Sequence, residues 1–335
     1  MKPEGEETTQ TVDQTNSGEE FTEALKKARE TSWRCFGRRI RFYAPSFMPY
    51  RNRYWNDHAR LFPSISITGR SCTLKCKHCD GRLLETMIPA ESPSDLARLF
   101  QELHRRNGEG CLVSGGCTQQ GAVPLKPFLD VIREAKRKLG LKVVVHTGLV
   151  NEDLASELAK AEVDAALIDV IGSDETIKEI CRLDGTVKDY DASLSALEAI
   201  GISTVPHVLV GLHYGRMRGE FKALEMISHH RPAAIIVIAF TPLPRTPMAQ
   251  YRAPSADDIA SVIIEARRLM PKVPTALGCA RPKGNTRKEI DCLAVRAGVN
   301  AVAYPDPEAI SLAEKMKLER SFSGLCCSQV YEELR

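Results

Sequence analysis

Short apolar runs alternate with longer stretches of helical periodicity along most of this chain, and this alternation limits the possible fold more than any other feature. The apolar runs cover residues 64–69, 110–116, 142–149, 165–171, 202–212, 233–240, 275–280 and 301–304. Several of the helical stretches between them begin at a capping residue, such as Ser94, Asn151 or Ser255, and several end in glycine. A strand followed by a helix, repeated in this way, predicts an α/β fold, a (β/α)8-like barrel over residues 64–317.

Barrels of this kind carry their chemistry on the loops that follow the strands, which gather at one end, the mouth. The loop after the first apolar run reads RSCTLKCKHCDGR, and the loop after the second reads SGGCTQQG. Later runs end in HTG, GLHYG, FTPLPRTPM and GCARP. Polar, glycine-rich and thiol groups are therefore predicted to lie together at the barrel mouth.

The segments that flank the barrel differ in charge. Residues 1–30 are polar and mostly acidic, which predicts a poorly ordered tail leading into a short helix. Residues 31–63 form a basic, aromatic arm that either binds an acidic partner or phosphates, or packs along the barrel as a solvated segment. Its charged and aromatic residues are Arg34, Arg38, Arg39, Arg41, Arg51, Arg53, Arg60, Phe42, Tyr43, Tyr50 and Trp55. Residues 318–335 form a short C-terminal tail that carries two adjacent cysteines.

The composition narrows the class of protein. Hydrophobic residues make up 43% of the 335 and charged residues 27%, as in ordinary globular proteins. No apolar run approaches the roughly 18 residues of a membrane span, and the first residues lack the basic and apolar regions of a signal peptide. We therefore expect a cytoplasmic protein without membrane or nucleic-acid partners, whose eleven cysteines are reduced thiols or metal ligands rather than a disulfide framework.

Three of these cysteines, Cys72, Cys76 and Cys79, are closely spaced in the loop after the first apolar run. Three thiolates at such spacing can hold three irons of a [4Fe–4S] cubane and leave the fourth iron open to a cofactor or substrate. An electron carrier normally closes that position with a fourth cysteine. A zinc site is the alternative, but structural zinc sites need four ligands, and His78 lies between two of the cysteines, where it cannot easily join them on one metal.

The C-x3-C-x2-C motif on the loop after the first strand of a βα barrel resembles the radical S-adenosylmethionine (SAM) superfamily. The resemblance implies that Cys72, Cys76 and Cys79 bind a [4Fe–4S] cluster and that SAM binds beside it. The segment from Ser114 to Gly116 is similar to the family's Gly-Gly-Glu segment, although Cys117 stands where glutamate is usual. The SAM contacts that the resemblance implies are His78, Gly115, Gly116, Asp169 and Gly211.

The same resemblance implies a mechanism. One electron passes from the cluster to SAM, which breaks into methionine and a 5′-deoxyadenosyl radical, and this radical takes hydrogen from an unactivated C–H bond. The cofactors supply the difficult chemistry, while the protein positions them and excludes water and oxygen.

The eight other cysteines divide into two groups. Cys111, Cys181 and Cys292 suit buried hydrophobic positions, and Cys35 in the basic arm is undecided. The other four are Cys117, Cys279, Cys326 and Cys327. Two follow strands at the mouth and two lie in the tail, so three of them are predicted to hold a second, auxiliary [4Fe–4S] cluster; the alternative is that they are unrelated thiols. His146 and His213 also point to the mouth, where a purely structural role is the simpler interpretation.

Within the superfamily, the segment from Thr241 to Met248 resembles the Pro-x-x-Gly-Thr-Pro segment of the biotin synthase branch, with Arg245 in place of glycine. The stretches SITGRSCTLKCKHCDG, LVSGGCTQQGAVPL and LGCARP, with the adjacent tail cysteines, look most like one subunit of the two-protein lipoyl synthases. That family inserts sulfur, taken from an auxiliary cluster, into an octanoyl chain carried on a lysine.

The partners that this likeness implies are an acidic lipoyl carrier protein bearing octanoyl-lysine, a second radical SAM subunit and a reductant protein of the ferredoxin or flavodoxin type. The basic arm would then steer the carrier. Two alternatives stay open: a different radical SAM reaction of the same branch, and an iron–sulfur electron carrier or redox sensor. Only an enzyme would yield 5′-deoxyadenosine on reduction.

Overall fold

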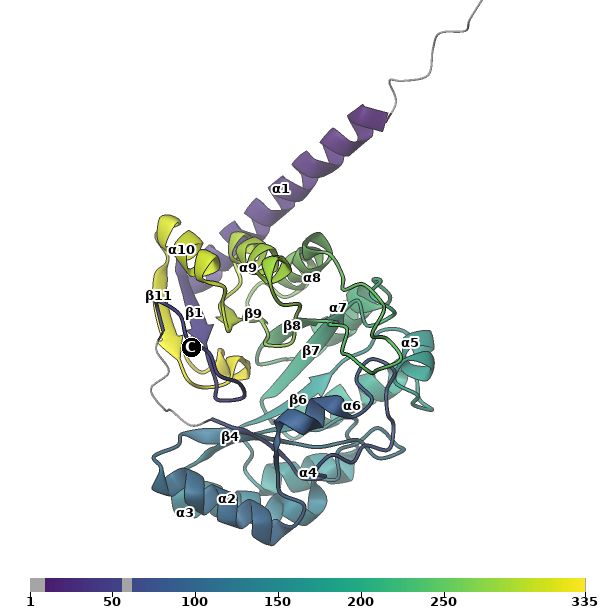
Figure 1. Ribbon diagram of the computed structural model, residues 1–335, viewed down its shortest axis with the longest axis vertical. Helices are drawn as coiled ribbons and strands as arrows, with labels where there is room; N and C mark the ends of the chain where they lie inside the picture. Colours follow the sequence, from purple (N-terminus) through teal and green to yellow (C-terminus); the bar gives the residue numbers. More distant parts are fainter. Residues whose placement is uncertain (1–9, 56–61, 335) are drawn as a thin grey trace, which may run out of the picture.

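The computed structural model describes residues 10–55 and 62–334, and within them eleven strands form one curved sheet (Figure 1). Their order across the sheet is β11-β1-β10-β9-β8-β7-β6-β5-β4-β2-β3, and every pairing between them is parallel. The strands are β1 Arg39–Tyr43, β2 Ser64–Ser66, β3 Ile88–Pro89, β4 Gly110–Ser114, β5 Lys142–His146, β6 Ala165–Asp169, β7 Thr204–Val210, β8 Ile235–Ala239, β9 Thr275–Leu277, β10 Ala301–Ala303 and β11 Glu319–Ser323. The sheet curls like a barrel, but in the described residues its edge strands β3 and β11 do not pair, so the barrel is open along one side.

Helices connect the strands and cover the outer face of the sheet (Figure 1). The α-helices are α1 Gln10–Phe36, α2 Pro93–Arg105, α3 Leu129–Leu139, α4 Glu152–Lys160, α5 Asp174–Glu179, α6 Val187–Ala199, α7 Glu220–Ser228, α8 Ala256–Leu269, α9 Asn285–Ala297 and α10 Pro307–Lys315. Three short 3-10 helices are η1 Arg82–Thr86, η2 Lys126–Phe128 and η3 Cys327–Gln329. Parallel neighbours need a crossover between them, and helices outside the sheet provide it.

Local sequence explains why these helices form and where they pack. Helix α2 begins at Ser92, two residues before the predicted cap, because the Ser92 hydroxyl accepts the Asp95 N–H. Its apolar residues Leu96, Phe100 and Leu103 recur at helical spacing and are buried against the sheet. Fully burying one such side chain stabilises the fold by about 1.5–3 kcal/mol relative to leaving it exposed.

All eight predicted strands are present, as β2 and β4 to β10, and the predicted α/β barrel fold is confirmed. Three strands were not predicted. Strand β1 lies inside the presumed arm, where Ile40, Phe42 and Tyr43 are buried, and it pairs with both β10 and β11. The arm is therefore partly an integral strand of the sheet, with its arginines alternating with buried apolar residues.

The C-terminal segment also differs from the prediction. We expected residues 318–335 to be a tail without a strand to pair with, but β11 pairs along its whole length with β1. The chain after β11 then lies inside the curve of the sheet, where η3 touches β6, β8, β9 and β10 (Figure 1). Leu325, Val330 and Tyr331 are buried there, so the tail is a plug of apolar side chains in the barrel interior.

At the other end, α1 replaces most of the predicted acidic, poorly ordered tail, whose first nine residues lie outside the described part of the chain. The last turns of α1 pack on α8 and α9, while its beginning extends away from the barrel (Figure 1). Arg60 of the predicted arm also lies outside the described residues. Among the helices that the structure describes, none has the length and apolar character to cross a membrane.

Candidate active site at the barrel mouth

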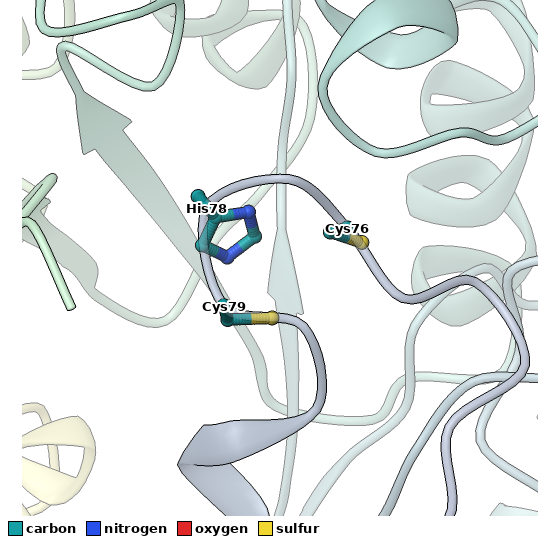
Figure 2. Close-up of side chains that lie close together, drawn as sticks. All are labelled: Cys76, His78 and Cys79. Atoms are coloured by element: carbon teal, nitrogen blue, oxygen red, sulfur yellow. The ribbon is translucent and has the colours of Figure 1, made fainter. Parts of the chain in front are cut away.

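The loop that leaves β2 carries all three cysteines of the triad, each with a free and partly exposed thiol. Figure 2 shows Cys76, His78 and Cys79 on one turn of this loop, with the His78 ring and the Cys79 sulfur on the inner side of the curve. The ligand atoms of these three residues lie within 4.8 Å of one another. We call residues 70–81 the cysteine loop.

The surroundings of Cys76 and Cys79 favour the protonated thiol at both residues. The Cys76 thiol lies 3.3 Å from the Cys181 carbonyl oxygen, and this hydrogen bond raises the pKa of Cys76 well above its usual range. The hydrogen bond from Cys76, together with burial, raises the pKa of Cys79 to about 12. Because only thiolates ligate iron, metal binding here must displace protons from the two thiols.

Glycine at position 116 is required by packing against the cysteine loop. A side chain there would place Cβ 2.0 Å from the Ser71 carbonyl oxygen and 2.5 Å from the Cys72 Cα. The Gly116 N–H donates to the Thr68 hydroxyl at 2.7 Å. The predicted reason for glycine was close approach of SAM; in the structure, close approach of the loop after β4 to the loop after β2 is by itself sufficient.

Gly211, another predicted SAM contact, follows β7 with φ +73°, and a Cβ there would lie 2.8 Å from Pro254. Its N–H donates to the carboxylate of Glu220, which is buried beneath the loop. Burial raises the pKa of Glu220. The backbone at Gly211 is thus fixed by a carboxylate and by the loop after β8, which gives this part of the mouth a defined shape.

Asp169 ends β6 and faces two histidines from the neighbouring strands. Its Oδ1 lies 3.4 Å from His146 Nε2, and its carboxylate, His146 and His207 place their ligand atoms within 4.8 Å of one another. Burial alone would raise the pKa of Asp169, but the charge and hydrogen bond of His146, with smaller effects of His207 and His78, lower it to about 2. In return, the Asp169 charge raises the pKa of His146 against the opposing effect of burial. Sequence reasoning assigned no role to His207.

Two polar atoms at the mouth have no hydrogen-bond partner of good geometry in the described chain, His78 Nδ1 and Asp169 Oδ1. Yet 43% of the Asp169 side-chain surface is accessible, although protein surrounds it closely enough for burial to act on its pKa. The Asp169 side chain is therefore partly accessible, while its Oδ1 atom is itself buried. Buried polar atoms normally find partners, so these two atoms indicate a space that a polar ligand fills.

The four cysteines predicted to share an auxiliary cluster separate into two places. Cys117 packs with Cys72 and Cys76, and the charges that act on its thiol are those of Cys72, Asp169 and Cys79. Cys279 instead packs with Cys326 and Cys327 in the barrel interior. The thiol of Cys326 is hydrogen-bonded to Cys327, and the charge of Cys326 acts on both Cys279 and His146. We call Cys279, Cys326 and Cys327 the interior thiols.

The separation of Cys117 has a topological cause. Cys117 follows β4 and Cys279 follows β9, and strands β5 to β8 lie between them in the sheet. We expected the two strand ends to face each other across a closed mouth. In the described residues the sheet is instead open between β3 and β11, and η3 of the tail contacts β6, β8, β9 and β10.

The two predicted mouth histidines lie in different surroundings. His213 is buried and its Nδ1 lies 3.1 Å from the Thr176 hydroxyl, which suits the structural interpretation. Burial lowers its pKa. His146 instead lies between Asp169 and the interior thiols and joins the two parts of the site.

Comparison with known proteins bears on this geometry. Residues 66–217, which run from β2 past β7 and include the cysteine loop, match the model of the radical SAM superfamily. A biotin synthase of Synechococcus elongatus is 23% identical over 254 residues, covering 74% of this chain and 78% of that protein. A biotin synthase of Buchnera aphidicola is likewise 23% identical, over 76% of this chain and 75% of that protein. The chain carries a radical SAM superfamily domain. Within that superfamily, the similarity lies with the biotin synthase-like branch.

Solved structures share the fold of this chain. A crystal structure of methylornithine synthase superposes with a TM-score of 0.62 at 13% identity, covering 95% of this chain and 92% of that one. The [FeFe]-hydrogenase maturase of Carboxydothermus hydrogenoformans superposes with a TM-score of 0.63 at 14% identity, covering 94% and 73%. At these identities the likeness concerns the fold alone.

Radical SAM membership implies a [4Fe–4S] cluster and SAM, and the residues present fit both. The donor set is three free thiols, the soft ligands that iron–sulfur clusters use. Beside them, His78 Nδ1 and Asp169 Oδ1 are buried without a hydrogen-bond partner in the described chain, as expected where a polar cofactor would supply one. The family therefore makes this chain an iron–sulfur enzyme, and the mouth is where its residues can hold the cofactors.

Proposed function

We propose that this enzyme inserts sulfur into an unactivated C–H bond of a protein-bound octanoyl-lysine, as a lipoyl synthase that acts with a second radical SAM subunit. The observation that supports it most is the second thiol group inside the barrel. Cys279, Cys326 and Cys327 gather inside the barrel, and the charge of Cys326 reaches His146, which lies 3.4 Å from Asp169. The similarity to biotin synthases and the sequence motifs of the tail point in the same direction.

In this proposal Cys72, Cys76 and Cys79 hold the catalytic cluster, and His78, Gly115, Gly116, Asp169 and Gly211 hold SAM. When bound, the cluster and SAM together supply a radical able to take hydrogen from an unactivated carbon. The Asp169 carboxylate, ionised because its pKa is about 2, would accept hydrogen bonds from ribose hydroxyls at any physiological pH. His146 Nε2 lies 3.4 Å from Oδ1 of the same carboxylate and helps to hold Asp169 in place.

The interior thiols are the proposed ligands of the auxiliary cluster. Cys326 and Cys327 are buried by the tail and Cys279 is partly buried, which favours the exclusion of water and oxygen from a reactive site. We leave Cys117, which lies with the triad, out of this ligand set, although the sequence alone had included it. A substrate carbon held near Asp169 would lie between the two proposed clusters.

The carrier protein would approach the mouth from the side of the basic arm. Lipoyl carriers of the implied kind are acidic, so exposed arginines at this rim would favour encounter. Not every arginine of the arm is available for this. Arg41 is ion-paired with Glu333, Arg38 lies over Trp33, and Arg39 donates to the Phe36 carbonyl.

A reconstituted assay tests the proposal. The anaerobically loaded enzyme is mixed with octanoylated carrier, the partner subunit, SAM and reductant, and the carrier is weighed by mass spectrometry. We expect Cys279→Ala to form 5′-deoxyadenosine but no thiolated carrier, whereas Cys292→Ala on α9 should behave as the unmodified enzyme. Normal thiolation by Cys279→Ala contradicts the auxiliary role, and absence of 5′-deoxyadenosine from the unmodified enzyme favours the electron-carrier alternative.

A further inference from the structure

Side chains from the cysteine loop, the end of α5 and the loop after β7 meet at one place, and the proposed function assigns no role to any of them. Lys77, which lies between Cys76 and Cys79 in the sequence, donates a hydrogen bond from Nζ to the Tyr214 hydroxyl at 2.6 Å and lies 3.3 Å from Glu179 Oε1. The Tyr214 hydroxyl donates to the same carboxylate at 2.5 Å. Lys77, Glu179 and Tyr214 thus form a closed polar triangle, here called the loop clamp.

The main chain of the cysteine loop is fastened at the same place. The Lys77 N–H donates to the Ile180 carbonyl at 2.7 Å, and the Cys76 thiol lies 3.3 Å from the next carbonyl, that of Cys181. Helix α5 ends at Glu179, and carbonyls at a helix end lack partners within the helix. The cysteine loop supplies those partners, so the end of α5 and the loop hold each other.

The backbone of the cysteine loop explains why such anchoring is needed. Lys75 and Asp80 both adopt left-handed conformations, with φ +46° and +47°, on either side of the two cysteines. For residues with a Cβ this costs about 1–2 kcal/mol each, and it persists only where the surroundings enforce it. Tyr214 of the clamp is itself left-handed, with φ +56°. The loop would otherwise relax to a different conformation.

Further contacts extend the clamp to a fourth loop. The Tyr214 ring lies 4.6 Å from the ring of Tyr251, in the loop after β8, and 5.2 Å from the ring of His213. A Cβ on Gly215 would lie 1.9 Å from the Arg252 carbonyl oxygen, so the two loops are in direct backbone contact. These contacts hold Tyr214 in place independently of its hydrogen bond with Lys77.

We propose that Lys77, Glu179 and Tyr214 are positioning residues that hold the cysteine loop in its ligand-binding conformation and set the local charge beside the cluster. The inference rests on the cluster that family membership implies and not on the identity of the substrate. It goes beyond the proposed function, and measurements on the cluster test it even if octanoyl-lysine is not the substrate.

Chelation of iron tests the positioning role. Two variants each remove one hydroxyl from the same pair of stacked rings: Tyr214→Phe breaks the clamp, and Tyr251→Phe leaves it intact. We expect a chelator to extract iron from reconstituted Tyr214→Phe about tenfold faster than from Tyr251→Phe, the scale of loss typical when a residue supporting a metal ligand is removed. Equal extraction rates overturn the proposal. If Tyr214→Phe fails to fold, Lys77→Met is compared with Lys178→Met, which changes an exposed lysine on α5.

Measuring the midpoint potential of the cluster distinguishes an electrostatic effect of these residues from a general loss of structure. Lys77→Met removes a positive charge next to a ligand, so reduction should become harder and the potential more negative. Glu179→Gln removes a negative charge from the same triangle, so the potential should become more positive. Lys77→Arg should restore the potential toward that of the unmodified enzyme. Shifts of the same sign in Lys77→Met and Glu179→Gln, or none beyond that of Lys178→Met, overturn the electrostatic part of the inference.

Discussion

The cysteine loop and the interior thiols are held by opposite means. The loop is partly exposed, has a strained backbone and is fixed by polar contacts to α5 and to the loop after β7. The interior thiols lie in an apolar cluster that the tail completes. A loop at the mouth can exchange metal and cofactor without disturbing the core. Cys326 and Cys327 are buried by the tail itself, so we expect metal loading at this place to be coupled to the packing of the tail.

Removing the triad should have the largest effect on activity and almost none on the fold. We expect the triple substitution of Cys72, Cys76 and Cys79 by alanine to abolish formation of 5′-deoxyadenosine from SAM. These three are the proposed cluster ligands, and among the described residues no other set of three thiols lies in the cysteine loop. The core is built from strands and helices, so the thermal midpoint of the cluster-free protein should stay within a few degrees of the unmodified one. Residual SAM cleavage would show that the cluster binds elsewhere.

A substitution in the C-terminal tail, which fills the barrel interior, should instead lower the stability of the fold. Tyr331 is buried in the interior, and its hydroxyl donates to the Asp164 carbonyl at 3.0 Å near the start of β6. Tyr331→Ala should lower the free energy of unfolding by about 3 kcal/mol, as for other large-to-alanine changes in cores. Leu83→Ala on the exposed part of η1 should change it by no more than about 0.5 kcal/mol. Urea unfolding measures both, and equal small effects would mean that the tail packs only loosely.

The sequence predicted the barrel because each strand and helix carries its own local pattern. It missed β1 and β11 because RIRFY and ERSFS contain more charged and polar residues than a buried strand usually has, and their partners are far apart in the chain. The pairing of Arg39 with Glu319 shows the scale of that separation. These segments form strands only because they pair with their neighbours in the assembled sheet.

The same reasoning explains what the sequence revealed of the site. The triad has a local spacing and could be predicted, and the comparisons support the family that it indicated. The loop clamp could not, because Lys77, Glu179 and Tyr214 share no motif and meet only through three loops. The grouping of Cys279 with the tail, without Cys117, depended on how far the sheet opens, which no local pattern encodes.

His207, which lies on β7 beside Asp169, should make stability depend on pH. Burial lowers the pKa of His207 to about 4, from an ordinary value near 6.5. Between these values the unfolded chain binds a proton that the folded protein does not, so stability is lost as pH falls from about 6.5 to 4. The loss attributable to His207 should reach about 2 kcal/mol at pH 5 relative to pH 8.

His207→Gln should remove that part of the pH dependence, measured by urea unfolding of the cluster-free protein at both pH values. His104→Gln, which changes an exposed histidine on α2, is the matched control and should follow the unmodified protein. If His207→Gln loses as much stability on acidification as the control does, the neutral form of His207 is not what the fold requires.

The smallest expected effect concerns the basic arm, and the structure changes which residue should be tested. Charge reversal at Arg38, Arg39 and Arg41 would break contacts with Met316, Phe36 and Glu333, so a loss of activity would reflect the fold as much as a partner. Arg51 is exposed beyond β1, which makes it the cleaner probe.

Arg51→Glu should lower the association rate of an acidic carrier a few-fold at low salt, and this difference should shrink as salt screens the charges. SAM cleavage in the absence of carrier should not change. Lys222→Glu on α7 makes the same change of charge on a helix away from β1 and should leave association unaffected (Figure 1). Association slowed equally by both variants would mean that net charge, and not the arm, steers the carrier. An association rate unchanged by either variant would remove the arm from the proposed docking route. The roles proposed for the cysteine loop and the interior thiols would not be affected, because no interaction shown for the described residues joins either of them to Arg51.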